Sequence, residues 1–477
     1  MRVLVPALGF FLSACTVGTE YVQPTPSLPQ RWHTVTGEVT EPATSQPRNP
    51  ANPAPLPWWT LFGDAVLNTL VEEALMQGFS VRQAATRIAA ARAERNAISA
   101  GRLPAVGVGL GASRQENVFP GLPNQQDFSL FDAGFDARWE LDVFGRTGRR
   151  VEAADARVEA LAAAQDAARL VLVAEVSRTY WALRTDEQNL ALTEEQFVLA
   201  AEWHRLQGRR LTGGVATRQD VVTAAARMEQ VGAARAPLQA AIAVSRRQLE
   251  LLLARQPGAL EAPLTRPAAA AKTVPVSAVL EMPAAVITQR PDIRRAEREL
   301  AAATALRNAA VADRYPRISL GLLVGLANTS IGALFSGPSQ VLLAGGQLMA
   351  PLFDGGKLRA AVDMSDAAVA EAALAYEQTA LTALHEVEMS LSRLLAAEQQ
   401  QKSLARAAAL AQESVDIAAR RYAQGAADRL ELVSARFTAV DAARRVAIAE
   451  GEIQTALVAL CKALGSGIPS SNLVGKN

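Results

Sequence analysis

Residues 131–143 read FDAGFDARWELDV, and this stretch decides the fold. Side chains of opposite character alternate along it, so an extended strand here has one apolar and one ionic face. The apolar face carries Phe131, Ala133, Phe135, Ala137, Trp139, Leu141 and Val143, and the ionic face carries Asp132, Asp136, Arg138, Glu140 and Asp142. A half-buried strand of a soluble sandwich shows the same alternation. The stretch nevertheless exceeds the mean strand of about 5–6 residues and suits a membrane barrel, whose strands need about 9–11, so we expect a transmembrane β-barrel with an anionic lumen.

Three further strands are predicted from similar patterns. Val106, Val108 and Leu110 alternate with glycines, alternate residues from Ile318 to Leu326 share one apolar face, and residues 341–352 alternate only weakly around Gly345-Gly346. Four strands cannot close a barrel within one chain, because a sheet edge exposed to hydrocarbon leaves backbone groups unsatisfied. The chain must therefore oligomerise, with any number of copies that closes the barrel.

The chain after residue 57 consists of an internal duplication that includes the strands. Val81-Arg82 through Pro104 match Ile293-Arg294 through Pro316, and Arg210 with Gly214 match Arg421 with Gly425. One unit of about two hundred residues has been duplicated, which is too long for a solenoid repeat. We expect a first structural repeat over 58–260, a linker over 261–277, a second structural repeat over 278–465 and a C-terminal tail over 466–477.

Each repeat also contains long helices. No proline interrupts residues 145–211, and Val176, Leu183, Leu190 and Phe197 recur every seven residues, which indicates a coiled-coil seam. This helix would be about 100 Å long at about 1.5 Å per residue, and it is too charged to cross a bilayer. The other helices are predicted over 81–102 and 292–314, each stopping before a proline, over 217–255 with a kink at Pro237, and over 356–425 and 428–464.

The N-terminus looks like a lipoprotein signal. Arg2 precedes an apolar run that ends in Leu12-Ser13-Ala14-Cys15, so residues 1–14 are predicted to be a signal peptide. In the resemblance to bacterial lipoproteins, Cys15 receives an S-diacylglycerol and an N-acyl (palmitate-type) lipid, and Thr16 in place of Asp points to the outer membrane. An ordinary secretory signal with an incidental cysteine is the alternative. Residues 15–57, rich in Pro and Thr, are predicted to be a lipidated tether.

The sequence gives little support for nucleic-acid binding, catalysis or metal binding. Lys+Arg 48 against Asp+Glu 47 gives no nucleic-acid footprint. Cys461 lies in an apolar helical stripe and is predicted to be a buried hydrophobe. The histidines, His33, His204 and His385, have no metal-binding spacing, and there is no nucleophile motif, so we expect no enzyme activity, no metal and no cofactor beyond the lipid. A structural coiled-coil lipoprotein of the envelope is an alternative, but it leaves the amphipathic strands unexplained.

Six segments carry a specific resemblance. They are Cys15-Thr-Val-Gly with Tyr21 and Pro24, Trp58-Trp59-Thr-Leu-Phe62-Gly-Asp64, Glu140-Leu-Asp-Val-Phe144-Gly-Arg146, Arg290-Pro-Asp292-Ile, Tyr315-Pro-Arg-Ile318 and Pro351-Leu-Phe-Asp-Gly-Gly-Lys357. In this order they resemble the TolC-like outer membrane factor family, in its lipoprotein branch typified by OprM and the NodT-type efflux lipoproteins. The resemblance covers nearly all of the mature chain.

The resemblance implies a fold and a function. The fold is mainly α with β: a long periplasmic antiparallel α-helical barrel plus a transmembrane β-barrel, with four strands per protomer shared in a homotrimer. The function is the outer-membrane exit duct of a tripartite RND-type efflux system, which exports small molecules and meets a periplasmic membrane-fusion adaptor and an inner-membrane RND pump. The duct of a type I protein secretion system shares the fold and is the alternative.

The resemblance also places functional residues at the helix tips. Relatives close the duct there with carboxylates, and the matching positions are Glu431 and Ser434, where Ser434 replaces an acid. The gate is therefore expected at Asp428, Glu431 and Ser434, with Asp428 and Glu431 as its acids. Threefold rings of acids would make a cation-selective constriction, whereas the alternative is that Asp428 and Glu431 are ordinary first-turn helix carboxylates. The adaptor is expected to contact the hairpin turns at Arg210, Leu211, Gly213, Gly214, Arg421, Tyr422 and Gly425, although basic residues in a last helical turn also occur for capping alone.

Overall fold

The computed structural model describes residues 17–24, 32–33, 57–115, 128–260 and 288–465. The predicted signal peptide, Cys15, the linker over 261–277 and the tail over 466–477 lie outside the described residues. The chain divides into two compact units. The sheet unit comprises Met1–Thr25, Thr86–Ala162 and Arg295–Gln378, and the helical unit comprises Pro26–Ala85, Ala163–Arg294 and Thr379–Asn477.

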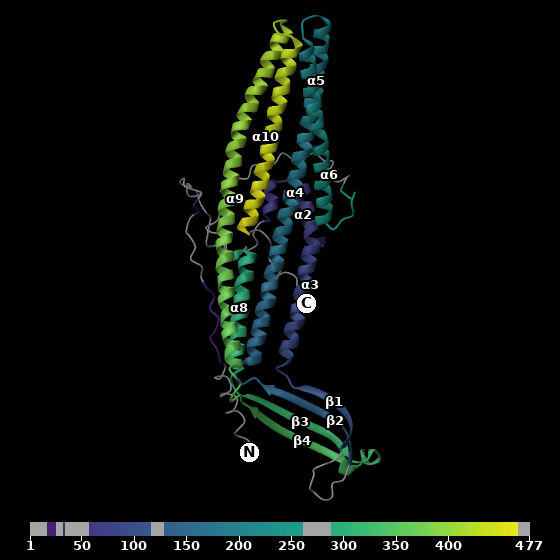
Figure 1. The fold of residues 1–477 in the computed structure, drawn as a ribbon, viewed down its shortest axis with the longest axis vertical. Helices are drawn as coiled ribbons and strands as arrows, with labels where there is room; N and C mark the ends of the chain where they lie inside the picture. The colour runs from purple at the N-terminus through teal and green to yellow at the C-terminus, as the bar shows by residue number, and fades with distance from the viewer. Residues whose placement is uncertain (1–16, 25–31, 34–56, 116–127, 261–287, 466–477) are drawn as a thin grey trace. The chain divides into compact units, whose positions relative to one another are not determined.

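The sheet unit contains one antiparallel sheet in the order β1-β2-β3-β4 (Figure 1). Its strands are β1 (Ala105–Gln115), β2 (Phe128–Leu141), β3 (Arg317–Asn328) and β4 (Gln340–Met349). All four strands are therefore where the sequence predicts them, including the weakly alternating fourth. The register sets Val108 opposite Phe135, Phe135 opposite Val324, and Val324 opposite Leu342, so one apolar row crosses the whole sheet. These four side chains are between 46% and 73% exposed.

The opposite face explains the glycines of β1. Asp136 lies opposite Gly107, and a Cβ added to Gly107 would come 2.8 Å from the Asp136 carboxylate. Asp132 likewise lies over Gly111, so the acids of β2 fold onto a neighbouring strand that has no side chains there. One part of the strand prediction is wrong: β2 ends at Leu141, so Asp142 does not belong to the ionic face. Its carboxylate instead accepts hydrogen bonds from the first turn of the following helix.

The helices agree closely with the predicted ranges. They are α3 (Phe79–Ala100), α4 (Arg146–Thr212), α5 (Arg218–Ala233), α6 (Arg235–Leu252), α8 (Pro291–Ala312), α9 (Lys357–Ala423) and α10 (Arg429–Leu464). The kink predicted at Pro237 is confirmed as a break between α5 and α6, because Pro237 has no N–H to donate to the carbonyl of Ala233. Within the described part of the chain, no helix is both long and apolar enough to span a membrane.

One pair of elements was not predicted. A short 3₁₀ helix, η2 (Trp58–Phe62), and α2 (Ala65–Gln77) precede α3. Asp64 caps α2 by accepting from Val66 N at 2.8 Å, and it also accepts a 2.6 Å hydrogen bond from the Tyr180 hydroxyl of α4. Asp64 is 2% exposed and Tyr180 is fully buried, and burial together with the bond to Asp64 raises the pKa of Tyr180. This motif therefore pins α2 onto α4.

Aromatic and aliphatic side chains build the core of the helical unit around this bond. The ring of Phe62 lies 5.5 Å from that of Trp181, and Trp58 and Trp59 pack edge to face beside them. Cys461 belongs to the same core at 2% exposed, as predicted, and burial raises the pKa of its thiol to about 12.

A buried carboxylate orders the end of α6. Glu250 is 2% exposed and accepts hydrogen bonds from Arg247, from Gly258 N at 2.9 Å and from Leu260 N at 3.1 Å. Burial alone would raise the pKa of Glu250, but these hydrogen bonds outweigh it and hold that pKa below its usual value. The ionised form of Glu250 therefore stabilises the turn that follows α6.

The predicted seam of α4 holds only along part of the helix. Val176 and Leu183 are fully buried, whereas Leu190 and Phe197 are partly exposed. Thr193 and Gln196 are buried in their place. A straight helix drifts about 20° per heptad from a seven-residue repeat, so positions chosen every seven residues rotate out of the contact.

Several described residues of the predicted tether (15–57) contact the helices. Tyr21 donates a 2.7 Å hydrogen bond to Glu297 of α8, and Asn308 donates to Thr19 O at 2.8 Å. Tyr376 of α9 donates to Pro24 O at 3.2 Å, and Trp32 is buried in the core of the helical unit. The described residues of this segment form no helix or strand, and aromatic side chains such as Tyr21 and Trp32 dock them onto the helices.

Candidate functional site

The two hairpin tips have the same backbone design. At the end of α4, Gly214 adopts a φ of +73°, and Val215 N donates to Arg210 O at 2.9 Å. At the end of α9, Gly425 adopts a φ of +69°, and Ala426 N donates to Arg421 O at 2.8 Å. A left-handed glycine lets the chain reverse while the last helical carbonyls stay hydrogen-bonded.

The helices that leave the tips begin with side-chain caps. Thr217 and Asp220 form a reciprocal capping box at the start of α5, and hydrogen bonds from the backbone and hydroxyl of Thr217 lower the pKa of Asp220. Asp428 caps α10 by accepting from Glu431 N at 2.9 Å. Asp428 therefore lies at the N-cap of α10, and Glu431 lies in its first turn.

The predicted gate acids also contact the predicted adaptor-binding arginines. Arg210 Nη1 lies 2.5 Å from Asp428 Oδ2 and joins α4 to the start of α10, and Arg421 pairs with Glu431 inside the second hairpin. The side chains of these pairs are between 40% and 53% exposed. Each acid is therefore balanced by a guanidinium of the same chain, which the sequence alone did not indicate.

Two further contacts link the first hairpin (α4 and α5) to α10. Arg429 Nε donates to Glu202 Oε1 at 2.6 Å, and this bond raises the pKa of Arg429. The guanidinium of Arg227 on α5 lies 3.8 Å from the ring centre of Phe437 on α10 and 5.5 Å from that of Trp203 on α4. Sequence reasoning missed these residues, because none of them belongs to a motif or to the predicted seam.

The remaining predicted tip residues lie at exposed or partly exposed positions. Gly213, Gly214, Tyr422 and Gly425 are exposed, and Leu211 is partly exposed. Ser434 lies one turn beyond Glu431 and lines a groove of about 570 Å³ with Arg421, Asp428 and Glu431. All three predicted gate residues thus line one groove near the tip of the second hairpin. Figure 1 shows the two helices of that hairpin, α9 and α10.

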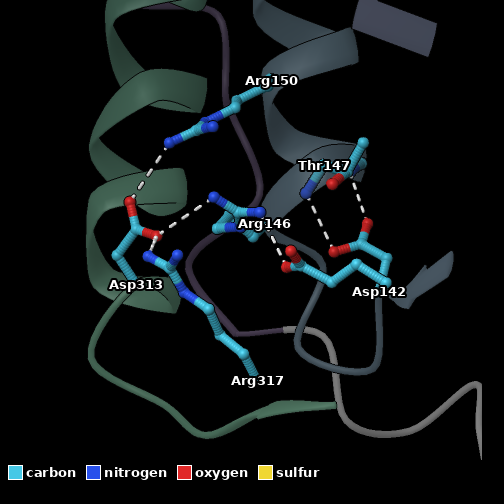
Figure 2. Close-up of polar contacts among 8 residues, drawn as sticks. Asp142, Arg146, Thr147, Arg150, Asp313 and Arg317 are labelled. Atoms are coloured by element: carbon cyan, nitrogen blue, oxygen red, sulfur yellow. Dashed lines mark hydrogen bonds and ion pairs between the residues drawn. The ribbon is translucent and has the colours of Figure 1, made fainter. Parts of the chain in front are cut away.

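A second polar cluster lies in the sheet unit, where β2 meets α4. Figure 2 shows Asp142 accepting from Thr147 N at 2.9 Å, while Gly148 N donates to its other oxygen at 2.6 Å. Arg146 pairs with Glu140 at 2.7 Å. The motif from Glu140 to Arg146 therefore connects the strand to the helix through a capping carboxylate and an ion pair.

Asp313, just after α8, is shared by three arginines. Arg317 Nη2 lies 2.9 Å, Arg150 Nη2 3.3 Å and Arg146 Nη1 3.6 Å from its oxygens (Figure 2). At the other strand-to-helix connection, Asp354 caps α9 by accepting from Gly356 N and Leu358 N. Across the part of the chain that the structure describes, no group of His, Cys, Asp and Glu residues gathers in a way that would hold a metal ion.

Comparison with known proteins gives a consistent result. The family model described as outer membrane efflux protein matches residues 70–255 and 282–466. Nodulation protein T of Rhizobium leguminosarum bv. trifolii is 28% identical over 475 residues, which cover 98% of this chain and 97% of that protein. Outer membrane protein OprJ of Pseudomonas aeruginosa is 31% identical over 464 residues, which cover 96% of this chain and 94% of that protein. The solved structure of the outer-membrane channel OprN superposes with a TM-score of 0.83 at 30% identity and covers 94% of this chain and 99% of that chain.

The two family matches together span well over half of the chain, and the structural match extends to both the helices and the sheet. The chain belongs to the family of outer membrane efflux proteins.

Proposed function

We propose that this chain is the outer-membrane exit duct of a tripartite RND-type efflux system and exports small molecules. The observation that carries the proposal is the sheet. One face presents an apolar row from β1 to β4, and the outer strands β1 and β4 each have a partner on one side only within the described chain. In hydrocarbon such edges must be paired, and three copies of a four-stranded sheet close a twelve-stranded barrel.

The long helices supply the periplasmic part of the duct. α4 and α9 each have 67 residues, or about 100 Å at about 1.5 Å per residue. Their charged composition excludes them from hydrocarbon, so three copies would stand in the periplasm as an α-helical barrel. A lipid on Cys15 would add an anchor, and it is supported by Val17, which donates to Phe144 O beside the end of β2.

The tips form the proposed periplasmic gate, with Asp428, Glu431 and Ser434 on the groove of the second hairpin. The pair of Arg210 with Asp428 and the pair of Glu202 with Arg429 tie α10 to α4. Opening would move the second hairpin away from the first and break these pairs. Because guanidinium groups neutralise the acids in this conformation, cation selectivity is expected only once the pairs have separated.

The adaptor is proposed to contact the exposed turns at Leu211, Gly213 and Gly214 and at Tyr422 and Gly425. Arg210 and Arg421 lie beside them but are engaged in ion pairs. Arg210 becomes available to an adaptor as the gate opens, because its partner Asp428 moves away with the second hairpin. Adaptor binding and gate opening would therefore favour each other.

Two measurements test the proposal. The lipidated chain, purified and placed in a planar bilayer, is expected to form conducting channels whose native mass corresponds to three copies. In a host without its own efflux channel, the chain co-expressed with a periplasmic adaptor and an inner-membrane RND pump is expected to restore export of a fluorescent dye. A chain that neither conducts nor restores export contradicts the proposal, and restored secretion of a protein without dye export favours the type I secretion alternative.

A further inference from the structure

Basic residues gather at one end of the sheet. β1 and β3 start where β2 and β4 finish, since Ala105 pairs with Arg138, Leu141 with Ile318, and Arg317 with Met349. All four connections between strand and helix therefore lie at the same end. These connections, residues 101–103, 140–152, 313–317 and 350–359, contain eight basic and five acidic residues.

Acidic residues of these connections form contacts within the chain. Asp142 and Asp354 cap α4 and α9, and Asp313 is shared by three guanidinium groups (Figure 2). The N-termini of α4 and α9 and the C-termini of α3 and α8 all lie at this end, so their helix dipoles offset one another and the excess of three basic residues decides the sign of the charge. The outward potential at this end of the sheet is therefore positive.

Several basic side chains here are free to meet a partner. We define the basic rim as the six exposed or half-exposed residues of these connections: Arg102, Arg150, Arg314, Arg317, Lys357 and Arg359. Arg150 and Arg317 remain 44% and 49% exposed although they share Asp313. Arg314 and Arg359 make no ion pair with any residue that the structure describes.

Exposed apolar and aromatic side chains accompany the rim. Trp139 near the end of β2 is 38% exposed and donates a 2.9 Å hydrogen bond to Arg102 O. Leu103 is 68% and Phe353 93% exposed, and they lie in the connections before β1 and after β4. Amphipathic rings and basic side chains directly beyond an apolar span are the composition of a membrane interface.

We propose that the basic rim binds the phosphates of anionic phospholipids at the periplasmic surface of the outer membrane. The guanidinium groups match phosphate geometry, and Trp139 and Phe353 place the apolar boundary next to them. The inference rests on the proposed membrane location of the sheet and adds to it a preference for one class of lipid. The rim is distinct from the tips, which belong to the other unit.

Trp139 offers a built-in reporter. The other tryptophans belong to the helical unit, where Trp32, Trp58, Trp59 and Trp181 are buried and Trp203 is partly buried. Lipids with brominated acyl chains quench tryptophan only on contact, so quenching in reconstituted vesicles reports lipid beside Trp139. Competition between brominated phosphatidylglycerol and brominated phosphatidylethanolamine yields their relative binding constant, which is expected to favour phosphatidylglycerol several-fold.

The rim variant is Arg314→Gln with Arg359→Gln, chosen because neither arginine holds a described ion pair. The several-fold preference is expected to fall to nearly equal binding of the two lipids, since each basic side chain near an anionic surface contributes up to about fivefold. The matched control is Arg393→Gln with Arg406→Gln, two exposed arginines of α9 in the helical unit, which should leave the preference unchanged.

The outcomes separate this inference from the proposed function. Equal binding of the two lipids by the wild-type chain overturns the proposal that the basic rim binds anionic phospholipids. A preference that survives in the rim variant overturns it as well. Absence of Trp139 quenching by either brominated lipid contradicts the membrane location itself. Both variants are expected to unfold at the same temperature as the wild type, because neither loses a described ion pair.

Discussion

Replacing Asp428 with Asn is expected to shift the channel toward its open state. Asn caps a helix N-terminus as well as Asp does, so α10 keeps its start, while the charge that faces Arg210 is lost. The change therefore removes one ion pair between α4 and α10, leaves the pair of Glu202 with Arg429 in place, and does not disturb the second hairpin. Asp416→Asn is a suitable control, because Asp416 is an exposed acid of α9 whose described hydrogen bond is with Gln412 of the same helix.

The size of the effect follows from the exposure of the pair. Arg210 and Asp428 side chains are 40% and 53% exposed, and ion pairs this accessible contribute about 0.2–1 kcal/mol. In a trimer the three copies together stabilise the closed state by at most about 3 kcal/mol, which corresponds to a change of up to about 150-fold in the ratio of open to closed channels. Salt screens the pair, so the difference from wild type is expected to shrink at high ionic strength.

Single-channel recording in planar bilayers measures this ratio directly. At low ionic strength Asp428→Asn is expected to be open several times more often than wild type, and Asp416→Asn to behave as wild type. An unchanged open fraction in Asp428→Asn at low ionic strength would show that this ion pair does not hold the gate.

Three further predictions concern stability and maturation. Tyr180→Phe removes a donor from buried Asp64 and is expected to lower the free energy of unfolding by about 1–3 kcal/mol, measured by denaturant titration against wild type. The pKa of Glu250 is lowered in the folded chain. The contribution of Glu250 to stability is therefore present above the usual carboxyl pKa of about 4.3 and is lost as pH falls through the lower folded pKa. Over that pH range the unfolding temperature of the wild type should fall more steeply than that of Glu250→Gln. Cys15→Ser is expected to reduce the amount of chain in the outer-membrane fraction more than the conductance of the chains that reach it, and a variant that arrives in normal amount but cannot conduct would contradict this.

The predictable parts of the fold are those with a local period. The four strands follow from alternation, and the register then aligns Val108, Phe135 and Val324 on one face without further information. The hairpin turns follow from glycines placed where a helix must stop, as at Gly214 and Gly425. Helix ends differ from the predicted positions by only a few residues, because prolines and caps mark them.

The parts that sequence reasoning missed depend on long-range contacts. The partner of Asp428 is Arg210, 218 residues away, and no local pattern encodes that pairing. The segment around Asp64 was recognised as a family motif, but helix α2 was not predicted, and its docking onto α4 depends on a hydrogen bond to Asp64 from Tyr180, 116 residues further along the chain. Docking of Tyr21 onto α8 likewise depends on a surface far away in the sequence.

The most direct test of the central claim, that three copies close one barrel, is to join the two sheet edges covalently. With Cys461 changed to Ser and Cys15 kept for lipidation, a cysteine at Val108 of β1 is combined in turn with one at Leu342, Ala344, Gly346 or Leu348, which share the apolar face of β4. Because β4 of one copy would lie beside β1 of the next, at least one combination is expected to give, after oxidation in the outer membrane, a covalent species of three chains and none larger. A panel without any cross-link, or a ladder that extends beyond three chains, would contradict the closed trimeric barrel.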